Sequence, residues 1–118
     1  MRVLLVTIII GSDEYYQTYE KLFKQSQINY AKKHGYDHKI IREFIDDTYK
    51  NHQISLYFQK SLVCRPSWAQ NYDFIIYVDN DIYININSPP IHNYYDFGSN
   101  VGVVDEATQP SKHDREFV

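Results

Sequence analysis

Two aspartates, Asp79 and Asp81, stand one residue apart directly after the apolar run at 74–78. Carboxylates held this close in a water-poor place resist joint ionisation unless a divalent cation or a set of hydrogen-bond donors compensates their charge. The pattern therefore predicts a cation site at the end of a buried strand. A plain turn between two strands explains the same residues, because Asp and Asn favour turns through local hydrogen bonds.

Composition limits the classes of protein to consider. The chain has 118 residues, a net charge of -3 and 43% hydrophobic residues, which predicts one domain over 1–118 with a modest core. No basic field is present for nucleic acid. The single cysteine, Cys64, excludes an internal disulfide and a Cys-based zinc site, so a reducing compartment fits best.

The apolar run at 3–10 follows Arg2 and could pass for a short signal peptide. No small-residue cleavage site comes after it, and the sequence Gly-Ser-Asp-Glu at 11–14 is typical of a strand-to-helix turn instead. No stretch is long enough to span a bilayer. We therefore expect a cytoplasmic protein.

The elements that must position the two aspartates alternate between strand and helix. The run at 3–10 is continuous and aliphatic, as in a strand covered on both faces. Ser12 or Asp13 then caps a helix that ends at Gly35, after the cations of its last turn. The apolar positions of this helix fall at helical spacing: Tyr15, Tyr19, Leu22, Phe23 and Tyr30.

The rest of the chain continues this alternation. A second strand is predicted at 38–44, a polar connection at 46–52, a second helix at 53–65 that Pro66 breaks, and a third strand at 74–78. After the aspartates, 83–87 is predicted as a strand with one buried face, because Ile82, Ile84 and Ile86 alternate with Tyr83, Asn85 and Asn87. A short strand at 101–104 completes the prediction.

This βαβαβ order predicts a parallel sheet with right-handed crossovers. Open sheets of this kind bind ligands beyond the carboxyl ends of their strands. Both Asp79 and the turn after Ile10 lie at such ends. The topology therefore favours a functional site over a purely structural turn.

An Asp-x-Asp after the third strand of such a chain resembles the metal and sugar-nucleotide site of GT-A fold glycosyltransferases. Asn-Tyr-Ala at 29–31 and His-Gly-Tyr at 34–36 are similar to a segment of the galactosyl/mannosyltransferase family, which includes fungal mannan and plant xyloglucan enzymes. Lys60 matches that family's helix lysine. The resemblance implies a Rossmann-like nucleotide-diphospho-sugar transferase fold, with a mainly parallel sheet flanked by helices. It covers the N-terminal, donor-binding half of the family's domain, so we expect the domain to be incomplete at its C-terminus.

The resemblance also implies roles for the motif. Asp81 would coordinate Mn2+ or Mg2+, which bridges the diphosphate, and Asp79 would contact the ribose or the metal shell. A divalent ion stabilises the charge that develops on a leaving nucleoside diphosphate. Hard oxygen ligands suit Mg2+ or Mn2+. Asn80 either offers its amide to the ribose or makes the turn.

Three further positions are implied to bind the nucleotide sugar. Thr7 and Ile8 correspond to the place where family members hold the base, and Tyr15 could stack on uracil. Tyr15 also begins the apolar stripe of the first helix, which is the competing interpretation. On a helix, Lys60 is surrounded by apolar neighbours, so its ammonium needs either a phosphate or Asp79, or reaches solvent along its stem.

The resemblance implies transfer of a hexose or pentose from a nucleotide-diphosphate sugar to a glycan acceptor, with retention of configuration. A UDP-sugar is the favoured donor and a GDP-sugar the second choice. The family's later acceptor and catalytic segment is not identifiable, so we expect this chain alone to be inactive and its exposed faces to favour association with another chain. Two alternatives stay open: a phosphotransfer enzyme of the haloacid dehalogenase type, and a non-catalytic interaction module.

Overall fold

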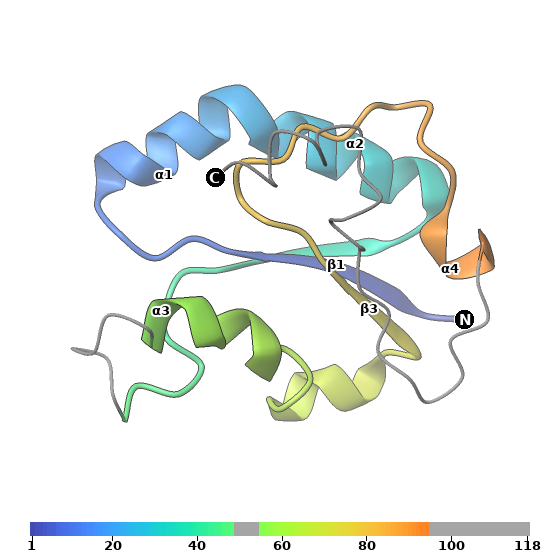
Figure 1. Ribbon diagram of the computed structural model, residues 1–118. Coiled ribbons are helices and arrows are strands. Elements are labelled where there is room, and N and C mark those ends of the chain that lie inside the picture. The colour runs from blue at the N-terminus through green and yellow to red at the C-terminus, as the bar shows by residue number, and fades with distance from the viewer. Residues whose placement is uncertain (49–54, 95–118) are drawn as a thin grey trace, which may run out of the picture.

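Three parallel strands form the centre of the computed structural model, which describes residues 1–48 and 55–94 (Figure 1). β1 (Val3–Ile8) pairs on one side with β2 (Asp37–Ile41) and on the other with β3 (Phe74–Tyr77). Every residue of β1 is buried, which confirms the aliphatic run as a central strand. Each strand stops earlier than the sequence predicted. With helices on both faces, the chain is a small α/β domain.

One long helical stretch covers the first face of the sheet. It consists of α1 (Asp13–Tyr19), the π-helix η1 (Glu20–Lys24) and α2 (Gln25–His34). Both predicted ends are confirmed. The Ser12 hydroxyl accepts a hydrogen bond from the Tyr15 amide at 3.1 Å, and Gly35 closes the helix in the left-handed conformation with φ of 72°.

The buried face of this helix differs from the predicted stripe. Tyr19 and Tyr30 are buried, but Leu22 is 52% exposed and Tyr15 is 46% exposed. The prediction for Leu22 was wrong because η1 winds as a π-helix, whose wider turn rotates the following side chains away from α-helical spacing. Ser26 and the fully buried Gln27, both polar, take part of the inner face instead.

Short helices cover the second face of the sheet. They are α3 (Ser55–Phe58), the 3-10 helix η2 (Gln59–Leu62) and the 3-10 helix η3 (Ser67–Asn71). The predicted helix ends at Leu62, earlier than the predicted break at Pro66, and η3 begins directly after that proline. In the part of the predicted 53–65 helix that the structure describes, 55–58 is α-helical, 59–62 winds as a 3-10 helix, and 63–65 is not helical. Val63 and Trp68 from this layer pack against Leu4 and Val6 of β1.

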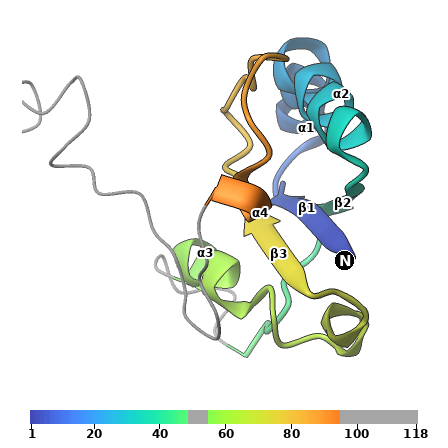
Figure 2. The same ribbon diagram turned by 90° about the vertical axis from the view of Figure 1, so that its right-hand side faces the viewer.

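The two layers follow from the strand order. β1 leads outward to β2, and the chain then crosses back over β1 to reach β3. Because both crossovers are right-handed in such sheets, opposite directions of travel place their helices on opposite faces. Figure 2 shows α1 and α2 on one side of the strands and α3 on the other.

The segment at 83–87 is not a strand, and this prediction was wrong. Its main chain finds partners among the side chains of α2 rather than in the sheet: the Ser26 hydroxyl accepts from the Ile84 amide at 3.0 Å, and the Lys33 ammonium donates to the Ile86 carbonyl at 2.7 Å. Of the three isoleucines predicted to be buried, Ile82 and Ile86 are 43% and 47% exposed. The segment leads to the short helix α4 (Ile91–Tyr94).

The short strand predicted at 101–104 lies outside the described residues. Within 1–48 and 55–94, no helix is both long and apolar enough to cross a membrane.

Candidate functional site

A hollow of about 330 Å³ lies at the carboxyl ends of β1 and β3. Six of the seven residues that the sequence pointed to line it, and three further apolar or aromatic side chains complete the wall. The lining residues are Ile8, Ile10, Tyr15, Leu56, Lys60, Tyr77, Asp79, Asn80 and Asp81.

The hollow lies where the chain changes direction across the sheet. From β1 the chain passes to β2 on one side, and β3 lies on the other, so the crossovers diverge between β1 and β3. A crevice opens at such a switch point because the two connecting layers leave to opposite faces, and open α/β sheets bind their ligands there. The chain therefore brings its acidic pair to the position that this architecture favours for a ligand.

Asp79 and Asp81 are both exposed, so the expected water-poor setting of the pair is wrong. β3 ends at Tyr77, and the chain turns outward at 80–81 before an interior could close over the carboxylates. Among the described residues, no ion pair joins either carboxylate to Lys60. The same residues contain no group of three or more His, Cys, Asp or Glu side chains able to hold a metal ion.

Asn80 ties three elements together at the floor of the hollow. Its side-chain amide donates to the Ile8 carbonyl at 2.9 Å, and its side-chain oxygen accepts from the Tyr15 hydroxyl at 2.9 Å. The end of β1, the first turn of α1 and the acidic turn are thereby linked through one side chain. The Asn80 side chain thus anchors the acidic turn to β1 and α1.

Tyr15 stands at the rim of the hollow rather than in the core. Its ring lies over Gly11, where an added Cβ would meet the ring at 3.2 Å, and its hydroxyl is held by Asn80. The interpretation of Tyr15 as the start of a buried stripe therefore fails. The ring is held at both ends, yet one part of it stays open to solvent.

Thr7 does not reach the hollow. It is fully buried, and because side chains alternate along a strand, it shares the face covered by α2 with Val3 and Leu5, while Ile8 points to the opposite face. Its hydroxyl oxygen is buried and has no hydrogen-bond partner among the described residues. The structure thus separates two neighbours that the resemblance grouped together.

Lys60 is exposed and borders the hollow with Leu56. Of the apolar neighbours that the sequence predicts for Lys60, Leu56 and Cys64 are exposed and Val63 is buried, and η2 itself winds as a 3-10 helix. The ammonium nevertheless shares one hollow with Asp79 and Asp81. A cation from one layer and two carboxylates from a strand end thus line the same cavity.

Sequence reasoning missed Tyr77 as part of the site. It is half-buried at the end of β3, and burial first, then the charge of Asp79, raise the pKa of its phenol. The phenol therefore stays protonated at neutral pH and can donate a hydrogen bond beside the carboxylates. Its position two residues before Asp79, at the end of the apolar run, was the available signal.

Gln27 was missed as well. It is fully buried beneath the acidic turn, and its side-chain amide donates to the Asp79 carbonyl at 3.3 Å and to the Ile82 carbonyl at 2.9 Å. A polar residue at helical spacing between Phe23 and Tyr30 was the signal for it.

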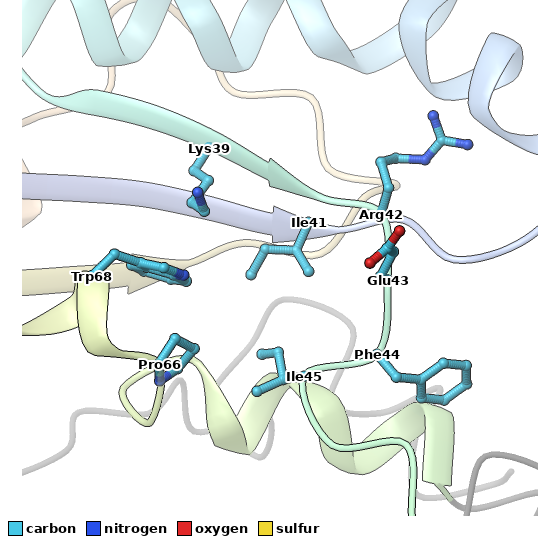
Figure 3. A pocket seen from close by; sticks show the side chains of 8 residues that line it. All are labelled: Lys39, Ile41, Arg42, Glu43, Phe44, Ile45, Pro66 and Trp68. Atoms are coloured by element: carbon cyan, nitrogen blue, oxygen red, sulfur yellow. The ribbon is translucent and has the colours of Figure 1, made fainter.

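A second hollow of about 350 Å³ lies between the end of β2 with the loop after it and the segment at 66–68, and none of the predicted residues lines it. The Lys39 ammonium lies over the Trp68 ring, 4.8 Å from the ring centre. Ile41 lies between this pair and the loop that follows β2 (Figure 3). The hollow lies at the carboxyl end of β2 rather than between β1 and β3, and Glu43 is the one carboxylate among its lining residues.

The chain was compared with protein-family models, with curated proteins and with solved structures, and none of the three comparisons found a match.

Proposed function

We propose that this chain is the donor-binding part of a metal-dependent glycosyltransferase, which binds a nucleotide-diphosphate sugar and a divalent cation in the hollow at Asp79 and Asp81. The observation that carries the proposal is the meeting of an acidic pair, a lysine and apolar walls at the switch point of a parallel sheet. The volume of about 330 Å³ falls in the usual range for small-molecule sites, roughly 300 to 1,000 Å³. We propose a GT-A type fold on the same ground.

The two carboxylates suit Mn2+ or Mg2+. These ions are typically held by one or two protein carboxylates, with water and substrate phosphates supplying the other ligands, and they need no larger set of protein groups. Exposed carboxylates at the mouth of a hollow meet this requirement. Asp81 would be the ligand and Asp79 a second ligand or a ribose contact. When bound, the ion would stabilise charge on the departing nucleoside diphosphate.

The other lining residues would contribute either polar contacts to the diphosphate or apolar surface to the base and sugar. Lys60 would pair with the diphosphate from the opposite wall, and the Tyr77 phenol would donate to a phosphate or ribose oxygen. Ile8 and Leu56 offer apolar surface to the base or the sugar, with Tyr15 as the aromatic edge. A UDP-sugar is the favoured donor, a GDP-sugar the second, and a glycan the acceptor. We assign no catalytic residue.

The proposal is tested by calorimetric titration of the chain with UDP-glucose, UDP-galactose and GDP-mannose, each with and without Mn2+. We expect binding that requires Mn2+ and that Asp81→Asn weakens by more than about tenfold, because loss of a direct ligand should exceed the effect of losing an outer-shell partner. The matched control is Asp47→Asn, which neutralises an exposed carboxylate that does not line the hollow. Equal affinity with and without Mn2+, or equal losses in the two variants, would refute the proposal.

A further inference from the structure

A buried glutamine lies directly beneath the turn that carries the two aspartates. Gln27 of α2 has no exposed surface. Its amide nitrogen donates to the carbonyls of Asp79 and Ile82, at 3.3 and 2.9 Å, and its side-chain oxygen accepts from the Tyr19 hydroxyl at 2.8 Å. The contact with Tyr19 is buried and the two carbonyl contacts are partly buried. Because the Gln27 side chain itself is fully buried, each hydrogen bond also avoids the cost of an unpaired polar group.

The two carbonyls are the first and last of one turn. The Ile82 amide donates to the Asp79 carbonyl at 3.3 Å and closes that turn, so Asp81 lies inside a loop whose two ends Gln27 holds from below. Asn80 holds the same loop from the side of β1. Two exposed carboxylates would otherwise repel each other and move apart, since nothing buries their side chains.

We infer that Gln27 is a positioning residue that sets the turn in a cation-binding geometry before any ligand arrives. The cation-binding role of the turn rests on the proposed function. Whether Gln27 holds the turn in place does not depend on that function. Groups in the outer shell that orient metal ligands typically change metal affinity about 10- to 100-fold when removed. Gln27 acts through the backbone of Asp79 and Ile82 and touches no ligand itself.

A second buried glutamine provides a matched control. Gln59 is 2% exposed, accepts from the amides of Ile45 and Asp46 at 2.7 and 3.1 Å, and donates to the Asp46 carbonyl at 3.0 Å. It thus organises a loop in the same manner as Gln27, away from the acidic turn. Gln27→Leu and Gln59→Leu remove equivalent buried amides, so a merely structural role predicts equal consequences for metal binding.

The first measurement is the affinity for Mn2+ alone, read from the paramagnetic resonance signal of the free ion. We expect Gln27→Leu to weaken binding about tenfold or more and Gln59→Leu to leave it within about twofold. Tyr19→Phe, which removes only the hydroxyl that orients the Gln27 oxygen, should give a smaller loss and serves if Gln27→Leu does not fold. Equal losses of Mn2+ affinity in the two glutamine variants would overturn the inference. If Gln27→Leu does not fold, an unchanged Mn2+ affinity in Tyr19→Phe would overturn it.

The second measurement does not depend on metal binding. Backbone order parameters are measured for 79–82 in the unaltered chain and in the variants. We expect order parameters of about 0.85 in the unaltered chain and in Gln59→Leu, and a decrease to about 0.6 in Gln27→Leu. If the unaltered chain binds no Mn2+ even in the presence of UDP, the proposed function fails, while these order parameters still decide whether Gln27 holds the turn. A turn that stays equally rigid in Gln27→Leu would overturn the positioning role whatever the metal does.

Discussion

The side chain of Asn80 links three elements, so its removal should destabilise the fold as well as the site. Asn80→Ala deletes the donor to the Ile8 carbonyl and the acceptor for the Tyr15 hydroxyl, both at 2.9 Å. Ile8 is 6% exposed, and leaving a buried acceptor unpaired costs about 1–3 kcal/mol. Tyr15 is 46% exposed, so its hydroxyl turns to water at a cost of roughly 0.5 kcal/mol. We expect a total loss of about 2 kcal/mol.

The assay is urea denaturation of the unaltered chain, Asn80→Ala, Tyr15→Phe and the double variant. If the unfolding midpoint falls while the slope of unfolding free energy against urea concentration stays the same, the variant has lost stability and the unfolded chain is unchanged. Tyr15→Phe should lose roughly 0.5 kcal/mol alone and close to nothing in the Asn80→Ala background, because its partner is already absent. A loss below about 0.5 kcal/mol for Asn80→Ala, or full additivity in the double variant, would refute the reasoning.

Three further outcomes are expected. Lys60→Gln should weaken UDP binding several-fold and make the affinity less dependent on salt. Lys21→Gln, which changes an exposed lysine outside the hollow, should leave the affinity unchanged. Equal affinities of the two variants in calorimetry would show that Lys60 is not part of the site. Burial lowers the pKa of His38, so on acidification the histidine is protonated in the unfolded chain before it is protonated in the folded chain. Stability should therefore fall as the pH drops below 6.5, and the thermal midpoint of His38→Phe should not show this fall. Burial raises the pKa of Tyr77, so stability should fall as the pH rises above 10.0, and less steeply in Tyr77→Phe.

Much of the architecture could be predicted from local patterns. A continuous aliphatic run is stable only where both faces are covered, and β1 is the central strand. Ser12 and Gly35 bound their helix because capping depends on adjacent residues alone. The parallel order then brought the residues after β1 and β3 to one edge of the sheet, and six candidate residues line one hollow there.

Other features depend on partners that are distant in the chain. The segment at 83–87 alternates like a strand, but a strand needs a neighbour for its main chain, and side chains of α2 occupy that role. The π-turn at η1 decided which side chains of the long helix face inward. Neither the packing of α2 on the acidic turn nor the winding of η1 is visible in residue spacing.

The sequence by itself determined the order of elements up to the third strand, the two ends of the first helix and the acidic pair after that strand, because each depends on neighbouring residues and on topology. Only the tertiary structure decided that Asp79 and Asp81 stay exposed, that Thr7 lies on the face covered by α2 rather than in the hollow, and that Gln27 lies beneath the turn. Burial and hydrogen-bond pairing are properties of surfaces brought together from distant parts of the chain, and the packing of those surfaces determines them.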